Sequence, residues 1–263
     1  MSSIESVMKV IRSAQNGSGE EDARSEVVAA AIDEVVRITA ETYTRESDSY
    51  AQARTSQPWS HDAEMNGSLL SLVRERVASG EIQLGDLQRW RLLDVGAGYG
   101  RDVLRFRTEP DIEAVALEKA PGFILALRRL QADGSLPQGA VIPGDMRDMS
   151  AIRSGSFHCV RNHATLHHLP VVPHGLGADE AVAESRRVLA DGGVFYVLVK
   201  GGAGIDMIDT REGLGGRFFQ LFTTEMLVSL LERHSFSVQH LEECVEPRSS
   251  GDVKWLFALA TAV

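Results

Sequence analysis

The sequence contains little cysteine, little positive charge and no long apolar run, and each shortage excludes a class of protein. Its 263 residues include two cysteines, Cys159 and Cys244, so neither a disulfide framework nor a cysteine metal site is expected. Lysine and arginine number 27 against 37 acidic residues, and the net charge of -10 argues against a nucleic-acid partner, which would need a basic stripe. No apolar run approaches the ~20 residues of a membrane span, and 1–20 lacks the apolar core of a signal peptide. We expect a cytoplasmic protein, without membrane or nucleic-acid partners, that acts on a small molecule.

The segment 92–101 predicts a buried strand followed by a glycine-rich turn. Its glycines stand at alternate positions, Gly96, Gly98 and Gly100. Glycine lets the backbone come close to a ligand where a parallel strand ends and a helix begins. The dinucleotide fingerprint needs its third glycine three places after the second, and that place holds Arg101. This spacing disfavours a nicotinamide-dependent oxidoreductase.

Two further apolar runs also end in acidic residues. The run 112–118 ends in Glu118 about 20 residues past the glycine turn, a placement that suits hydrogen bonds to ribose hydroxyls. A third run, 140–143, leads into Asp145 and Met146. With Asp94 just before the glycines, three acids follow three predicted parallel strands.

These segments resemble the motifs of class I S-adenosylmethionine (SAM) methyltransferases, in the small-molecule branch typical of bacterial natural-product biosynthesis. The resemblance covers 89–263 and implies an α/β fold, a Rossmann-like seven-stranded and mostly parallel sheet with an antiparallel C-terminal strand and helices on both faces. It implies SAM as cofactor, S-adenosylhomocysteine as product, and methyl transfer to a carbon, nitrogen or oxygen atom. The implied cofactor-binding residues are Asp94, Gly96, Ala97, Gly98, Glu118, Lys119, Asp145, Met146 and Asn162.

The chain divides into three parts. Residues 1–22 are expected to be mobile, with a break at 15–19. Residues 23–88 form an N-terminal helical extension, in which the apolar residues of 23–42 recur at helical spacing and the segment from Tyr43 to Tyr50 resembles a lid. Residues 89–263 form the methyltransferase core. Whether the chain forms a homodimer stays open.

Three histidines follow the fourth predicted strand, where the acceptor would lie. An imidazole titrates near neutral pH, so we predict His163 as a general base, with His167 as the second candidate catalytic residue. The alternative is a purely structural role for all three, with proximity as the main source of catalysis. No carboxylate accompanies them in the pattern of a magnesium site, so a metal-independent reaction is expected.

The substrate pocket is expected between two mobile elements, the lid and the glycine-rich loop 201–216. Tyr43, Tyr50, His168 and Arg217 are the predicted substrate-binding residues, although Arg217 has an equal alternative in a salt bridge to a nearby acid. The sequence also leaves open a SAM-binding regulatory or assembly protein without catalysis. A small-molecule methyltransferase is the leading interpretation.

Overall fold

A seven-stranded sheet forms the centre of the computed structural model, which describes residues 3–16, 22–56, 61–172, 175–211, 215–247 and 251–263. The strand order is β3-β2-β1-β4-β5-β9-β8, and β9 runs antiparallel to the other six strands. The strands are β1 (Trp90–Val95), β2 (Ile112–Glu118), β3 (Val141–Pro143), β4 (Phe157–His163), β5 (Leu189–Lys200), β8 (Phe236–Glu246) and β9 (Val253–Ala262). The predicted mostly parallel sheet with an antiparallel C-terminal strand is confirmed.

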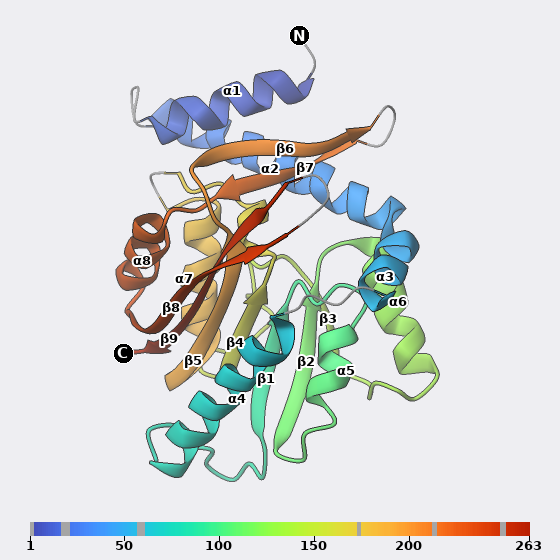
Figure 1. Ribbon diagram of the computed structural model, residues 1–263, viewed down its shortest axis with the longest axis vertical. Helices are drawn as coiled ribbons and strands as arrows, with labels where there is room; N and C mark the ends of the chain where they lie inside the picture. Colours follow the sequence, from blue (N-terminus) through green and yellow to red (C-terminus); the bar gives the residue numbers. More distant parts are fainter. Residues whose placement is uncertain (1–2, 17–21, 57–60, 173–174, 212–214, 248–250) are drawn as a thin grey trace.

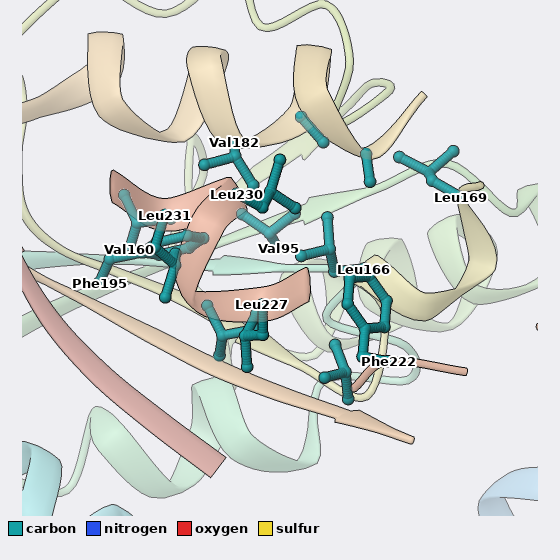
Figure 2. Close-up of a cluster of buried hydrophobic side chains, with 14 of the residues drawn as sticks. Val95, Val160, Leu166, Leu169, Val182, Phe195, Phe222, Leu227, Leu230 and Leu231 are labelled. Atoms are coloured by element: carbon teal, nitrogen blue, oxygen red, sulfur yellow. The ribbon is translucent and has the colours of Figure 1, made fainter. Parts of the chain in front are cut away.

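Helices cover both faces of this sheet because its central strands are apolar on both sides. One face packs against α4 (Asp62–Ala78), α5 (Arg101–Phe106) and α6 (Pro121–Ala132). The other packs against α7 (Ala178–Val188) and α8 (Thr224–Arg233). Figure 2 shows Leu227 and Leu230 of α8 beside Val95 and Phe195 of the sheet. Successive residues of β1 alternate between the two cores, with Leu92 in one and Leu93 in the other.

The prediction that 1–22 is mobile is wrong for most of that segment. Ser3–Gln15 forms helix α1, and Met8 and Ile11 are buried in the same core as α7 and α8. At its end, the Gln15 side-chain amide donates to Val171 O at 3.1 Å and to Gln220 Oε1 at 2.7 Å. The polar composition hid an apolar face at helical spacing, made by Ile4, Val7, Met8 and Ile11.

Two more helices complete the N-terminal extension, α2 (Asp22–Arg45) and α3 (Ser47–Ser56). The buried residues Ile32 and Val35 of α2 belong to the core that also contains Leu93 of β1. The extension is therefore packed onto the sheet assembly. No helix in the described part of the chain is both long and apolar enough to cross a membrane.

The glycine-rich segment after β5 is a hairpin, where the sequence analysis expected a mobile loop. Its strands are β6 (Gly204–Arg211) and β7 (Gly215–Leu221), with 212–214 outside the described residues. Phe218 and Phe219 are buried, and β7 packs along α2. The glycines obscured a β-forming run of aromatic residues, which α2 covers.

The two N-terminal helices and the hairpin gather at one end of the sheet. Figure 1 shows α1, α2 and β6–β7 together at the top of the view, with α3 beside α6. Thr42 of α2 donates to Gly216 O at 3.1 Å, and Thr39 of α2 accepts from the Phe218 N–H at 3.1 Å. We call α1–α3 together with β6–β7 the roof.

Candidate active site

A pocket of about 790 Å³ opens at the carboxyl ends of β1, β2, β3 and β4, beneath α2 and α3. This is the edge of a parallel sheet where ligands of doubly wound folds bind. The sheet side contributes Val95, Gly96, Gly98, Leu117, Glu118, Lys119, Ala120, Phe123, Gly144, Asp145, Met146, His163, Ala164, Thr165, His168 and Leu169. The roof contributes Val36, Thr39, Ala40, Tyr43 and Tyr50.

The three glycines of the turn after β1 are required for different reasons. All have positive φ, at +71° for Gly96, +58° for Gly98 and +92° for Gly100. A Cβ on Gly96 would lie 2.3 Å from the Thr165 side chain, and one on Gly100 would lie 2.8 Å from Leu127. A Cβ on Gly98 would project into open space in the pocket. Gly98 is therefore the position where the backbone itself presents a surface to a ligand.

Glu118 joins the glycine turn to the end of β2. Its Oε1 accepts from the N–H groups of Lys119 at 2.8 Å and Ala120 at 2.7 Å, and its Oε2 accepts from Gly98 N–H at 2.8 Å. Burial raises the pKa of this carboxyl, although the three N–H donors oppose the shift. The carboxylate fixes the turn and also faces the pocket.

A second acid lies beside Glu118, two residues after the end of the neighbouring strand β3. Asp145 accepts from Lys119 Nζ at 2.9 Å and from Arg147 Nη2 at 2.8 Å. Burial opposes ionisation of this carboxyl, but Arg147 and Lys119 outweigh it and lower its pKa to about 2. Met146 follows in the lining and supplies an apolar surface next to these charges.

A smaller pocket of about 480 Å³ adjoins the first and shares Tyr50, Gly96, Gly98, His163 and Ala164 with it. Its other lining residues are Asp94, Ala97, Tyr99, Arg101, Asp102 and Arg161. The smaller pocket is thus rich in charges of both signs.

Arg161 of β4 is the centre of these charges. It is 1% exposed and donates to Asp94 at 2.7 Å and to Asp102 at 2.9 Å, with a further bond to Asn66 of α4 at 3.2 Å. The sheet register places Arg161 directly beside Asp94. Burial raises the pKa of Asp94, whereas for Asp102 the charges of Arg161 and Arg101 outweigh burial and lower it. The sequence analysis missed Arg161, although an arginine inside an apolar strand signals a buried acidic partner.

His163 lines both pockets, as expected of a residue at the end of β4. Its Nδ1 lies 2.8 Å from the Tyr196 hydroxyl and its Nε2 lies 3.3 Å from Asp62 Oδ1 of α4. Burial and the charge of Arg161 lower its pKa to about 4. Both ring nitrogens contact protein groups, so the structure favours a role in orienting the pocket wall.

His167 and His168 lie on the short helix Leu166–His168, and only His168 is in the pocket lining. His167 Nδ1 accepts from the Lys200 N–H at 3.2 Å, and burial lowers its pKa well below the usual value. His168 Nε2 lies 2.9 Å from the Tyr43 hydroxyl. His168 therefore contacts the roof directly.

Most of the predicted site residues meet at the two pockets, and three do not reach either lining. His167 lies behind His168, with ring centroids 4.6 Å apart. The Asn162 side chain accepts from Leu166 N–H at 2.7 Å and donates to Met146 Sδ at 3.7 Å. The Arg217 guanidinium lies 5.3 Å from the ring centroid of Tyr43. These three residues support lining residues from behind.

The roof residues Val36, Thr39 and Ala40 were missed as pocket residues. With Tyr43 they recur at i, i+3, i+4 and i+7, which is one face of a helix. The helix itself was predicted from the apolar residues of 23–42, which do not include Thr39 or Tyr43. The same spacing identifies the face that carries Tyr43.

The two pockets fit an adenosyl cofactor. Gly98 presents open backbone, and Glu118 and Asp145 offer carboxylates near apolar Leu117 and Met146, as ribose hydroxyls and an adenine ring require. The smaller pocket offers two carboxylates and two guanidinium groups for a zwitterionic amino acid end. In the described part of the chain, no group of three histidine, cysteine or acidic residues is arranged to hold a metal ion.

Comparison with known proteins agrees with this fit. Residues 93–197 match the family model described as a methyltransferase domain. No curated protein matches the chain in sequence. The matched segment runs from β1 to β5, so α1–α4 and the chain after β5 lie outside it.

Solved structures share the fold at low sequence identity. A SAM-dependent methyltransferase from Methanosarcina mazei has a TM-score of 0.56 and 17% identity, covering 71% of this chain and 97% of its own. The 1,6-didemethyltoxoflavin-N1-methyltransferase of Burkholderia thailandensis, with 1,6-didemethyltoxoflavin and S-adenosylhomocysteine bound, has a TM-score of 0.59 and 17% identity, covering 88% and 90%. The [4+2]-cyclase SpnF has a TM-score of 0.51 and 18% identity, covering 72% and 80%.

Proposed function

We propose that this chain, a SAM-dependent methyltransferase by the match of residues 93–197 and by its fold, methylates a small and largely apolar metabolite in natural-product biosynthesis. Its cofactor is SAM. The observation that carries the proposal is the pocket, which places the cofactor-type surface of the strand ends opposite an apolar and aromatic surface of the roof.

The roof residues that line the pocket are uncharged. Val36, Ala40 and Tyr43 of α2 face Leu169 and Phe123 across the lining. The pocket has an empty volume of about 790 Å³ when the open solvent at its mouth is included, which is room for small molecules only. One structure of similar fold holds S-adenosylhomocysteine together with a small molecule, which supports an acceptor of that size.

Placement of the acceptor accounts for the chemistry without a strong base. SAM, when bound, supplies an electrophilic methyl group. Orientation of two reactants can remove on the order of 7–11 kcal/mol of a barrier, and the roof supplies both that orientation and the exclusion of water. Because the pKa of His163 is lowered to about 4, this imidazole is a weak base at neutral pH. The chain's contribution is then to bind, orient and desolvate.

Glu118→Ala should weaken SAM binding at least about tenfold. The substitution removes a carboxylate that faces the pocket and leaves the N–H groups of Gly98, Lys119 and Ala120 without that acceptor. Charge-assisted hydrogen bonds are worth roughly 1.5–3 kcal/mol. Isothermal calorimetry with SAM and S-adenosylhomocysteine measures the change, and Glu113→Ala on the same strand is the control. Equal affinity in Glu118→Ala and the native protein would contradict the assigned cofactor surface.

The proposed activity itself is tested with methyl-labelled SAM and a set of small aromatic and aliphatic alcohols, amines and N–H heterocycles. We expect label in an organic-soluble product for a subset of these acceptors. Binding of SAM without transfer to any acceptor, including compounds that bind the pocket, would favour a regulatory SAM-binding protein instead.

A further inference from the structure

Four hydrogen-bonded groups connect the roof to the end of β4 in a closed circuit. The Tyr43 hydroxyl meets His168 Nε2 at 2.9 Å, and His168 Nδ1 meets Phe218 O at 2.7 Å. The Phe218 N–H donates to Thr39 Oγ1 at 3.1 Å. Since Thr39 and Tyr43 are one turn apart on α2, the circuit returns to the helix where it began.

The chemistry of these groups fixes the direction of each bond. A carbonyl oxygen only accepts, so His168 Nδ1 carries a hydrogen and donates it to Phe218. A neutral imidazole has one N–H, so Nε2 is an acceptor and Tyr43 donates its hydroxyl hydrogen to it. His168 is 7% exposed, and burial with the nearby charges of Arg217 and Lys200 lowers its pKa to about 3, which keeps the ring neutral. Toward any further group the Tyr43 oxygen can then act only as an acceptor.

The surroundings of Tyr43 limit the kind of donor that suits this oxygen. Its ring centroid lies 5.5 Å from that of Tyr50 and 5.7 Å from that of Phe123, so the wall is aromatic. The Arg217 guanidinium lies 5.3 Å from the Tyr43 ring centroid, and the described roof residues that line the pocket include no carboxylate to pair with a cationic donor such as an ammonium group. A flat, neutral molecule with one donor group matches the wall.

We infer that the Tyr43–His168 pair selects neutral aromatic acceptors that carry an O–H or N–H group, such as phenols and N–H heteroaromatics. Tyr43 accepts the hydrogen bond from the acceptor molecule, and His168 is a positioning residue that holds the Tyr43 hydroxyl in the accepting orientation. The inference rests on the proposed function and narrows its substrate class. Tyr43 and His168 were predicted to bind substrate, and the circuit adds that the substrate donates the hydrogen bond and Tyr43 accepts it.

Two probes of nearly equal shape test the inference, 1-naphthol as the donor and 1-methoxynaphthalene as its methyl ether. Their dissociation constants are measured by fluorescence in protein saturated with S-adenosylhomocysteine. We expect the native protein to bind 1-naphthol at least about tenfold more tightly, because a site built for a donor rejects the analogue that lacks it. In Tyr43→Phe the two constants should differ less than about twofold.

The His168 variants test positioning separately from folding. His168→Ala should lose most of the discrimination, while His168→Gln, whose amide can still accept from Tyr43, should retain more of it. Nitrogen-15 NMR of His168 should show the Nδ1–H tautomer, unchanged from pH 5.5 to 9. If His168→Gln discriminates between the two probes no better than His168→Ala, or if His168 is the Nε2–H tautomer, the positioning role of His168 is overturned.

Glu41→Gln, on the exposed side of α2, is the control and should keep the naphthol preference. Tyr50→Phe removes the other hydroxyl of the same aromatic wall and tests which tyrosine accepts the bond; we expect it to keep more of the preference than Tyr43→Phe. If Tyr50→Phe loses the preference for 1-naphthol while Tyr43→Phe keeps it, then Tyr50 selects the acceptor and the inference is overturned. If S-adenosylhomocysteine binds but the native protein shows no preference, only this inference fails. If it does not bind, the proposed function fails.

Discussion

The strand-end side of the pocket and the roof differ in how they are built. The strand-end side comes from 93–197, where most lining residues lie at or soon after the end of a parallel strand and adjoining strands bring them together. The roof joins α1–α3 to β6–β7, segments about 170 residues apart in sequence, through bonds such as that from Thr42 to Gly216. The family match covers the first region and none of the second. The proposed cofactor surface is thus built from local motifs, whereas the proposed acceptor surface depends on contacts between distant segments.

The largest effect is expected from a substitution on the strand-end side of the pocket. In Arg161→Met two buried carboxylates, Asp94 and Asp102, lose their shared cation, and removing one partner of a buried charge set costs roughly 3–5 kcal/mol. Urea denaturation should show this loss in the free energy of unfolding. Arg37→Met, which removes an exposed ion pair on α2, should change little. If Arg161→Met lowers the free energy of unfolding by less than about 1 kcal/mol, then Asp94 and Asp102 find other partners in the variant.

The second effect concerns His163, at the border of the two regions. Its pKa is about 4 in the folded chain against 6.5 as the ordinary value, so the unfolded chain binds more protons between these pH values. The stability that the neutral ring contributes is complete above pH 6.5 and is lost as pH falls toward 4. Between pH 7 and 4.5 the free energy of unfolding of the native protein should fall by about 2–3 kcal/mol more than that of His163→Gln.

Subtracting the variant's curve is necessary because burial raises the pKa of Asp94 and Glu118, and such acids act in the opposite direction. Urea denaturation at several pH values gives both curves. Parallel curves for the native protein and His163→Gln would show that this imidazole titrates alike in the folded and unfolded chains.

The third effect weakens the roof alone. Thr39→Val leaves the buried Phe218 N–H without its acceptor, which costs roughly 1–3 kcal/mol. Affinity for S-adenosylhomocysteine should change less than about twofold, since the proposed cofactor surface lies at the strand ends. Ser49→Ala, on the exposed surface of α3, is the control for unfolding measurements. If the affinity for S-adenosylhomocysteine falls by as much free energy as the stability of the protein, the two sides of the pocket are not independent of each other.

The same division explains what the sequence could predict. Asp94, Glu118 and Asp145 could be predicted to lie together because their place at the ends of apolar strands is visible in the sequence, and such strands also indicate a mostly parallel sheet. Helix α1 and the hairpin were missed because polar residues and glycines dominate their composition, while α2 supplies the surface that both pack against. The contact of Tyr43 with His168 joins residues 125 apart and exists only after the chain has folded.

The smallest expected effect is that of chelation, because metal binding would have to disrupt bonds that hold the two regions together. His163 contacts Asp62 and Tyr196, and His168 contacts Tyr43 and Phe218, so a metal ion on either ring would displace a protein partner. Turnover measured after dialysis against EDTA should stay within about twofold of the untreated enzyme, with EDTA already saturated by magnesium as the control. Turnover that falls on chelation and returns with magnesium or iron would show that the histidines serve a metal, and the circuit through His168 would then need another explanation.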